Sequence, residues 1–193
     1  MLHKPRILED ELVADGKYIQ FIRRHFEDKK KRGVWEMVKR KTYGPVVSVA
    51  AITPKNELVI NRAYRISLKR YIIELPAGIM DKKGEPAIKT ARRELLEETG
   101  YDVKTLKKFV VSPANSGLLG ENIVVYLGTG AFWKQPQRPE DSEYLEVLKI
   151  PLRDFPKFAR TLPAHTTLDM KIPLVYFLLS PQGKKLFPQG MVT

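Results

Sequence analysis

The chain has 193 residues, of which 43% are hydrophobic and 29% charged, the composition of an ordinary globular protein. It carries a formal net charge of +12 at pH 7 and contains no cysteine, which excludes disulfides and thiolate metal sites. No apolar run approaches the roughly 18 residues of a membrane-spanning helix. The N-terminus lacks the apolar core of a signal peptide. We expect a cytoplasmic protein with no membrane partner.

The positive charge is densest between residues 23 and 41. A solvated basic surface is the commonest explanation of such a charge. A funnel for an anionic phosphate substrate is the second interpretation. A surface for nucleic acid is the third, because no aromatic-interleaved nucleic-acid motif accompanies the charge.

The first 43 residues are predicted to form a separate layer. Residues 17–23 alternate with a period of two and indicate a strand, and residues 33–40 indicate a second. The charged stretch 27–32 is the predicted turn between them. Because such a pair is too small to be stable alone, we expect it to pack on the main domain, residues 44–193, or on a second subunit.

The main domain is predicted to combine strands with one prominent helix, followed by C-terminal helices. Pro86 suits the first turn of that helix and Gly100 suits its C-terminal cap. Ile88, Ala91 and Leu95 mark its apolar face. The pattern indicates a mixed α/β domain. The predicted strands are residues 46–52, 58–65, 71–75, 106–112, 122–128 and 146–150, and the predicted helices are 86–99, 151–160 and 167–179, with Pro163 and Pro173 breaking or starting elements.

Three glutamates on the predicted helix carry the most informative pattern. Glu94, Glu97 and Glu98 project from neighbouring positions on one side of a helix, where like charges repel. Bound divalent cations would compensate, and magnesium is the natural choice beside phosphates. Arg93 precedes Glu97 by four residues and can orient its carboxylate. On these residues alone, an exposed acidic helix face is the commoner explanation.

The flanking residues change that balance. Glu85, seven further residues and then Arg-Glu-Leu-Leu-Glu-Glu-Thr-Gly-Tyr at 93–101 resemble the Nudix box. One departure is that six residues, not five, separate Gly78 from Glu85. The extra residue falls in the turn 81–84, and turns absorb insertions at low cost. The motif covers about an eighth of the chain, and its many fixed positions make it highly specific.

The resemblance implies a Nudix α/β/α sandwich with a mixed sheet, extended by the small N-terminal antiparallel β layer. It implies Mg²⁺, with Mn²⁺ as the alternative, which polarises a diphosphate and activates a water for attack at phosphorus. By position, the implied metal ligands are Glu94 and Glu98, with Glu97 as a ligand or a water-mediated contact, Glu85 as an outer ligand or support, the carbonyl of Ala77, and Arg93 and Glu97 in catalytic roles.

Features outside the box resemble the pyrophosphatases of ADP-ribose and nucleoside diphosphate sugars. They are Glu-Leu-Pro-Ala-Gly at 74–78, Ala-Tyr-Arg at 63–65, and Ser-Pro at 112–113 followed by Glu121. Ala114 replaces the usual glycine of that subgroup, and the loop after it is longer. The resemblance implies substrate contacts from Arg65 and Glu121, and a homodimer formed with the N-terminal strands.

Further site residues are open to two interpretations each. The resemblance implies a catalytic base in a late acidic loop, for which Glu143 is the first candidate and Glu140 the second, although a solvated acidic loop explains them equally well. Trp35 or Phe21 would stack on a base, but a buried aromatic anchor is the commoner role. Arg65 would contact phosphate or form a structural ion pair.

Three hypotheses for function follow. The first is Mg-dependent hydrolysis of the diphosphate in ADP-ribose or a related nucleoside diphosphate sugar, giving a nucleoside monophosphate and a sugar phosphate. The second is a non-catalytic Nudix module that binds a nucleotide or nucleic acid as a regulator. The third is hydrolysis of capped RNA ends or dinucleoside polyphosphates.

Overall fold

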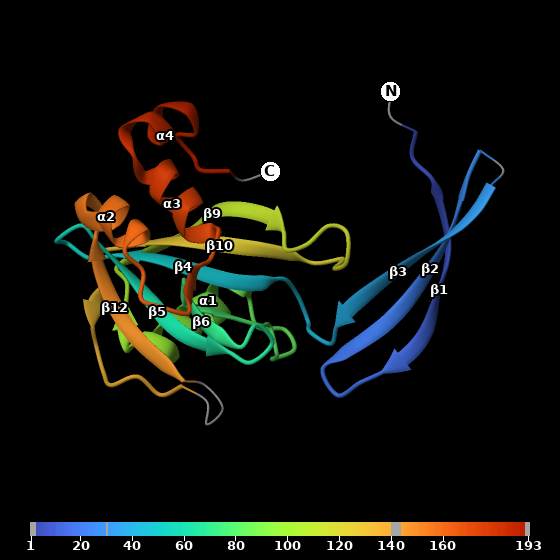
Figure 1. The fold of residues 1–193 in the computed structure, drawn as a ribbon, viewed down its shortest axis with the longest axis horizontal. Helices are drawn as coiled ribbons and strands as arrows, with labels where there is room; N and C mark the ends of the chain where they lie inside the picture. The colour runs from blue at the N-terminus through green and yellow to red at the C-terminus, as the bar shows by residue number, and fades with distance from the viewer. Residues whose placement is uncertain (1–2, 30, 140–143, 192–193) are drawn as a thin grey trace.

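The computed structural model describes residues 3–29, 31–139 and 144–191. Its main body is an eight-stranded mixed sheet with the strand order β13-β6-β5-β4-β10-β9, in which β12 also pairs with β5 and β7 with β4. Helices flank this sheet, and a three-stranded antiparallel sheet stands beside it (Figure 1). The predicted fold class, a mixed α/β sandwich with a small N-terminal antiparallel extension, is confirmed.

Six strands of the main sheet fall close to the predicted ranges, and β7 and β13 were not predicted. The pairs β4–β10 and β6–β13 are parallel and the other pairs are antiparallel. A separate two-stranded ribbon pairs β8 with β11. The strands are β4 (Val46–Ile52), β5 (Glu57–Arg65), β6 (Arg70–Glu74), β7 (Ala77–Gly78), β8 (Tyr101–Asp102), β9 (Thr105–Pro113), β10 (Asn122–Thr129), β11 (Phe132–Trp133), β12 (Leu145–Pro151) and β13 (Thr166–Leu168).

One apolar cluster packs on each of the two faces of the sheet. On one face Ala91 and Leu95 of the long helix pack against β4 and β5, whereas Ile88 is 42% exposed and lies outside the core. On the other face Ile172 and Val175 pack against the same strands. The helices are α1 (Ala87–Thr99), α2 (Phe155–Arg160), α3 (Lys171–Leu179) and α4 (Pro181–Leu186), with a 3₁₀ turn η1 (Leu152–Asp154) before α2.

The C-terminal region differs from the prediction in two elements. The predicted helix 167–179 begins only at Lys171, because Thr166–Leu168 forms β13 and pairs with β6. The β-branched threonines suit an edge strand better than a helix. Pro173 lies in the first turn of α3, where its missing N–H is tolerated. Helix α4 was not predicted.

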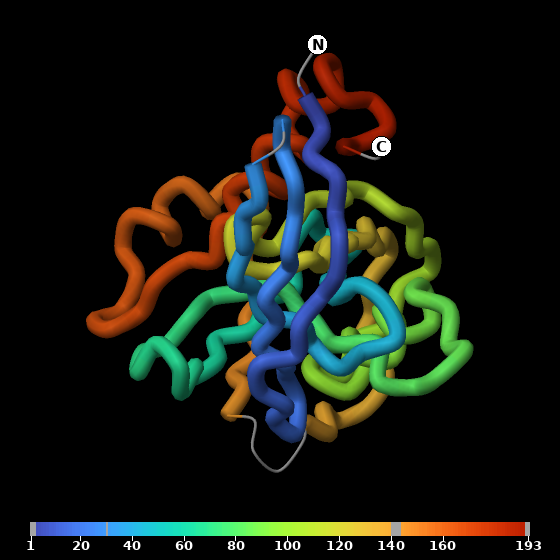
Figure 2. Tube along the Cα trace, turned by 90° about the vertical axis from the view of Figure 1, so that its right-hand side faces the viewer, coloured from blue at the N-terminus to red at the C-terminus, as the bar shows by residue number. Residues whose placement is uncertain are grey.

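The N-terminal sheet has three strands rather than the predicted two. They are β1 (Arg6–Asp15), β2 (Ile19–Asp28) and β3 (Lys31–Arg40). The charged stretch predicted as a turn belongs mostly to β2 and β3, where Glu27 lies opposite Arg32 in the strand register and forms an ion pair with Arg6 of β1. Figure 2 shows the three strands crossing in front of the main body. The division at residues 43 and 44 stays a prediction.

The N-terminal sheet touches the main body at the loop between β9 and β10. The indole Nε1 of Trp35 donates to the carbonyl of Gly117 at 3.1 Å. Val38 forms a bridge with Leu119, and its N–H donates to the carbonyl of Leu118. The lengthened loop noted in the sequence therefore holds β3 against the main body.

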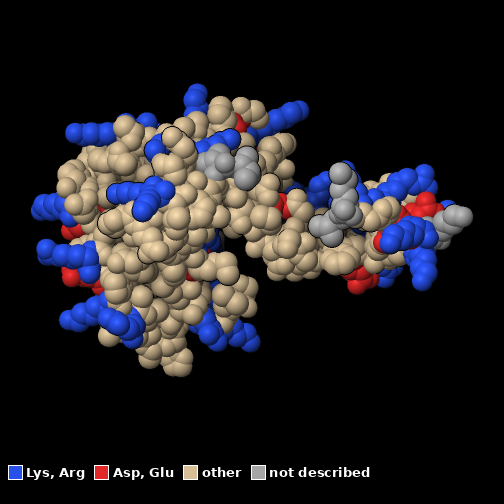
Figure 3. All heavy atoms as spheres, turned by 90° about the horizontal axis from the view of Figure 1, so that it is seen from above, with Lys and Arg blue, Asp and Glu red and all other residues tan. Residues whose placement is uncertain are grey.

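The basic side chains are widely distributed. In the view of Figure 3 lysines and arginines project from both the main body and the N-terminal sheet, with no single concentrated patch on that face. This distribution agrees with a solvated basic surface. Among the described residues, no helix is long and apolar enough to cross a membrane.

Asp102 fastens α1 to the ribbon of β8 and β11. Its carboxylate accepts hydrogen bonds from Arg92 Nε at 2.6 Å, Lys134 Nζ at 2.9 Å and the Val103 N–H at 2.8 Å. Burial alone would raise the pKa of Asp102, but Lys134, the Val103 N–H and Arg92 outweigh it and hold the pKa below its ordinary value. A lowered carboxyl pKa stabilises the fold above the unfolded value and stops doing so as the pH falls through the folded value.

Asp102→Asn is therefore expected to lower the free energy of unfolding by about 2 kcal/mol at pH 7. The difference from wild type should shrink as the pH falls far enough to protonate the folded carboxylate. Urea unfolding at pH 7 and in this acid range measures it. Asp154→Asn, in an exposed residue 3.7 Å from Arg153, is the matched control and should leave stability unchanged. An equal loss at both pH values would contradict the role assigned to the ionised carboxylate.

Candidate active site

Helix α1 places its glutamates against the sheet. Pro86 occupies the N-cap, one position before the predicted first turn, and Gly100 ends the helix with a φ of 74°. That left-handed conformation suits glycine. The Gly100 N–H donates to the carbonyl of Leu96 at 2.8 Å. Gly100 thus caps the C-terminus of α1, and Ala91 and Leu95, packed against the sheet, set which side of the helix carries the glutamates.

Glu98 is the most deeply placed of the three glutamates. Glu98 is only 5% exposed. Its Oε2 accepts hydrogen bonds from Asn61 Nδ2 at 2.7 Å and from the Ala77 N–H at 3.1 Å. A buried carboxylate with two donors on one oxygen has a fixed orientation.

Glu94 lies against the neighbouring residue of β7. A Cβ added to Gly78 would lie 2.5 Å from Glu94 Oε1, and closer still to Cγ and Cδ. Glycine is therefore required here by the approach of the glutamate, not by its backbone. Since Glu98 contacts Ala77 and Glu94 contacts Gly78, the two-residue strand brings both carboxylates to one place.

Arg93 is surrounded by four carboxylates. Its Nη1 lies 2.8 Å from Glu94 Oε1 and 3.0 Å from Glu97 Oε2. Its Nη2 lies 3.0 Å from Asp81 and 3.4 Å from Glu85. Burial opposes the charge of Arg93, but the surrounding carboxylates prevail and raise its pKa. Arg93 thus offsets the repulsion expected among the glutamates, and the predicted contact with Glu97 is present.

Glu85 faces this arginine. Its Oε2 accepts from Thr90 Oγ1 at 2.7 Å. The Thr90 hydroxyl, with Arg93, holds the pKa of Glu85 below its ordinary value. Of the two predicted roles, outer ligand or support, these contacts favour support of Arg93. The additional residue of the turn does not prevent this, since Asp81 of the same turn also reaches Arg93.

The carboxylates fit a divalent cation of the magnesium type. Within residues 3–29, 31–139 and 144–191, no three acidic or histidine side chains form a ready-made cage. Mg²⁺ seldom uses such a cage, because it is bound through one or two carboxylates together with waters and substrate phosphates. Glu94 and Glu98 supply two carboxylates beside β7. Glu97 is more exposed and lies farther out, paired with Arg93.

A cavity of about 560 Å³ opens over this place. Acidic and basic groups from three elements line it, among them Glu94 of α1, Arg40 of β3 and Arg65 of β5. The lining also includes Ala77, whose carbonyl stays a predicted metal ligand. The residues that complete the lining are Val46, Ser67, Gly78, Ile79, Asp81 and Arg93.

Arg65 is both an ion-pair partner and a wall of the cavity. Its Nη2 lies 2.6 Å from Glu74 Oε1, and its Nε donates to Glu74 Oε2 at 3.2 Å. Glu74 is buried, and burial raises its pKa against the opposing effect of Arg65. The two sequence-based interpretations of Arg65, structural pair and phosphate contact, are therefore compatible, because a fixed guanidinium still faces the cavity.

Glu121, whose predicted substrate contact stays a prediction, pairs with Arg40. Arg40 Nη2 and Nε lie 3.2 Å and 3.3 Å from Glu121 Oε1. Arg40 was not singled out in the sequence, where it belonged to a run of basic residues. In the structure it ends β3 and reaches the cavity. Glu121 thus holds a guanidinium that faces the cavity.

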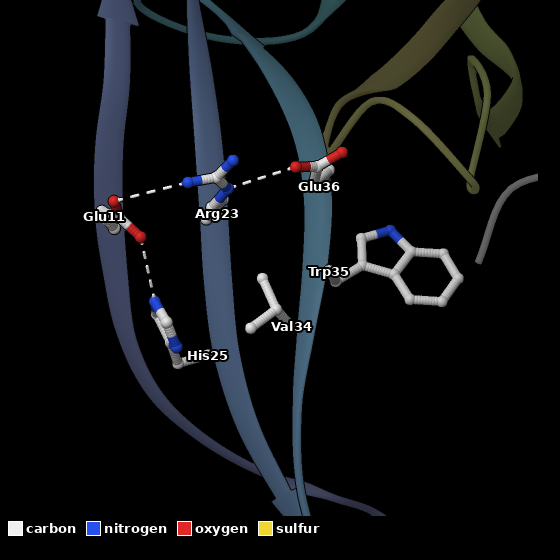
Figure 4. A pocket seen from close by; sticks show the side chains of 6 residues that line it. All are labelled: Glu11, Arg23, His25, Val34, Trp35 and Glu36. Atoms are coloured by element: carbon white, nitrogen blue, oxygen red, sulfur yellow. Dashed lines mark hydrogen bonds and ion pairs between the residues drawn. The ribbon is translucent and has the colours of Figure 1, made fainter.

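A second hollow, of about 590 Å³, lies on the N-terminal sheet. Figure 4 shows a row of charges across its three strands, in which Arg23 pairs with Glu11 and Glu36, and His25 with Glu11. Trp35 points away from this row. This hollow contains none of the box glutamates, so we assign the chemistry to the smaller cavity, where carboxylates and guanidiniums meet.

The predicted aromatic contacts have different environments. Trp35 is 51% exposed, so its interpretation as a buried anchor is wrong, although its Nε1 is held by Gly117. Phe21 is half-buried on β2. The predicted bases Glu140 and Glu143 lie outside the described residues.

Comparison with known proteins agrees with this geometry. A NUDIX domain model matches residues 42–168. The chain belongs to the Nudix family. The family resemblance drawn from the Nudix box is confirmed.

Several relatives of the chain are named ADP-ribose or ADP-sugar pyrophosphatases. The ADP-sugar pyrophosphatase of Mus musculus is 30% identical over 200 residues, covering 95% of this chain and 91% of that protein. The ADP-ribose pyrophosphatase of Bacillus subtilis (strain 168) is 35% identical over 109 residues, covering 56% of this chain and 58% of that protein. The match thus spans little more than half of the bacterial relative.

A solved structure shares the Nudix fold over the whole chain. The crystal structure of an ADP compounds hydrolase superposes with a TM-score of 0.74 at 21% identity, covering 100% of this chain and 99% of that chain. Because the coverage includes residues before the family match, the N-terminal extension is part of the shared architecture.

Proposed function

We propose that this Nudix protein hydrolyses the diphosphate linkage of ADP-ribose or a related nucleoside diphosphate sugar, releasing a nucleoside monophosphate and a sugar phosphate. The observation that carries the proposal is that Glu94, Arg40 and Arg65 line one cavity. Two guanidiniums suit the charge of a diphosphate, and the carboxylates suit a cation bound to it. The names of the relatives from Mus musculus and Bacillus subtilis support the substrate class.

The chain's own residues have separable roles in this proposal. Glu98 and Glu94 hold Mg²⁺, or Mn²⁺ in its place, with Glu97 farther out. When bound, the cation neutralises diphosphate charge and lowers the pKa of an attacking water. Arg40 and Arg65 orient the diphosphate, each held by a carboxylate of its own, Glu121 and Glu74 respectively. Arg93 keeps the acidic side of α1 assembled.

The N-terminal sheet is proposed to act in a homodimer. It contacts the main body mainly through β3 and the loop after β9, and leaves apolar side chains such as Ile7, Leu12 and Val34 exposed. Exposed apolar area on a sheet of this kind suits burial against a second copy. Exposed Trp35 then becomes available to stack on a base. A cytoplasmic location and Glu143 or Glu140 as the base remain predictions.

A substrate panel tests the proposal. ADP-ribose, other nucleoside diphosphate sugars, dinucleoside polyphosphates and a capped RNA are incubated with the protein in Mg²⁺ and in Mn²⁺, and the products are separated by anion-exchange chromatography. We expect AMP and ribose 5-phosphate from ADP-ribose, with the largest kcat/KM among nucleoside diphosphate sugars. Product formation should stop when the divalent cation is chelated.

Two results would replace the proposal with another. Preferred cleavage of capped RNA or of dinucleoside polyphosphates would move the chain to a different substrate class. Salt-dependent binding of RNA or DNA in a gel shift, with no hydrolysis of any substrate, would indicate a regulatory binding module.

A further inference from the structure

Asn61 is a polar residue in a position that the strand pattern reserves for apolar ones. On β5, Leu58 and Ile60 pack in the cluster on the side of α3, and Val59 packs in the cluster on the side of α1. Alternation along a strand therefore directs Asn61 to the same side as Val59, toward α1. Asn61 is 1% exposed. A carboxamide thus lies where the core of the domain would accept a valine.

The amide of Asn61 reaches the deepest glutamate of the site. Asn61 Nδ2 donates to Glu98 Oε2 at 2.7 Å, and the Ala77 N–H donates to the same oxygen at 3.1 Å. The two donors come from different strands, β5 and β7, while the acceptor comes from α1. Three elements therefore determine the rotamer of one carboxylate.

The other end of the amide is polar and buried as well. Asn61 Oδ1 has no hydrogen-bond donor among the described residues. A buried acceptor of this kind destabilises a core, and native proteins tolerate such groups mainly where a site requires them. The water molecules bound to a hydrated divalent cation are hydrogen-bond donors, and the Asn61 Oδ1 atom is an acceptor that could receive such a bond. Packing of the core does not explain why residue 61 is an asparagine or why its amide points toward α1. The hydrogen bond to Glu98 explains both.

We propose that Asn61 is a positioning residue for the metal site, which it serves by fixing Glu98 in the orientation that receives a divalent cation. This inference rests on the proposed function, in which Glu98 is a metal ligand. Partners that orient a ligand typically change metal affinity or activity by about 10- to 100-fold when they are lost. The side chain touches neither substrate nor the reacting phosphorus in this assignment.

Two substitutions of Asn61 remove the donor in opposite ways. Asn61→Leu keeps the size and removes all polarity, and Asn61→Ser keeps a hydroxyl that is too short to reach Glu98. Binding of Mn²⁺ to the substrate-free protein is measured by electron paramagnetic resonance of the free ion, and kcat and KM are measured with ADP-ribose. We expect both variants to bind Mn²⁺ at least about 10-fold more weakly, with a similar fall in kcat and a KM for ADP-ribose within about threefold of wild type.

The control is Ser48→Ala on the neighbouring strand. Ser48 is also buried and polar, but alternation with Val47 and Val49 directs it to the opposite face, and its hydroxyl has no partner among the described residues. It should retain wild-type Mn²⁺ binding and kcat. If Asn61→Leu does not fold, Asn61→Ser decides the question by the same measurements.

The possible failures are distinguishable. Wild-type Mn²⁺ affinity and kcat in either folded Asn61 variant would overturn the positioning role and leave the proposed function intact. A wild-type protein that neither binds Mn²⁺ nor cleaves a nucleoside diphosphate sugar would overturn the proposed function, and with it the inference.

Discussion

Glu98→Gln is expected to lower kcat by at least about 100-fold, because the loss of about 3 kcal/mol of transition-state stabilisation by the bound cation is sufficient for that change. The carboxylate is buried and already orients one oxygen toward the donors of Asn61 and Ala77. An amide in its place removes the negative charge that attracts the cation. The NH₂ group of the glutamine would also face either the donors of Asn61 and Ala77 or the cation, and it can neither accept a hydrogen bond nor bind a metal.

The measurement is kcat for ADP-ribose at saturating Mg²⁺, together with the circular dichroism spectrum and thermal midpoint. Glu97→Gln should have a smaller effect, because Glu97 is more exposed and pairs with Arg93. Glu146→Gln, on the exposed side of β12 and paired with Arg62, is the matched control and should leave kcat unchanged. Near-normal turnover by folded Glu98→Gln would remove Glu98 from the metal site.

The predictable part of the site is the part that is local in sequence. Glu94, Glu97 and Glu98 lie within two helical turns, and helical spacing alone places them together. The contact of Arg93 with Glu97 follows from the same spacing. The six longer strands of the main sheet were predictable from their apolar residues, and Gly100 ends α1 for a reason visible in the sequence.

The contacts that complete the site are distant in sequence and were not predictable. Arg40 and Glu121 are separated by 81 residues, and Asn61 and Glu98 by 37. Such pairs depend on which strands become neighbours, and strand order is not encoded in periodicity. The sequence therefore identified Glu121 as a polar residue near the site but not the arginine that it holds.

Three strands were not predicted because their sequences carry too weak a pattern. Strand β1 is exposed along its whole length, so apolar alternation gives only a weak signal there. Strands β7 and β13 have two and three residues, too few to show a period. Strand β7 nevertheless matters for function, because its two residues contact Glu98 and Glu94.

Gly78→Ala is expected to lower kcat by about 100-fold or more while the protein stays folded. The new methyl group would overlap the side chain of Glu94, with its Cβ 2.5 Å from Oε1. Because Glu94 is a flexible side chain, it can turn away at little cost to stability, but turning away removes a carboxylate from the cation. The thermal midpoint and kcat of this variant measure the two effects separately. Gly117→Ala, which meets no atom closer than 3.7 Å, is the control.

A double-mutant cycle decides whether the glycine acts through Glu94. If it does, Gly78→Ala has little further effect on kcat when introduced into Glu94→Ala, because the displaced group is already absent. Additive losses in kcat would instead mean that the methyl group disturbs β7 itself, and with it the Ala77 N–H that Glu98 accepts. The first result would tie the glycine that opens the Nudix segment to the position of one metal-binding carboxylate, and the second would tie it to the strand that supports another.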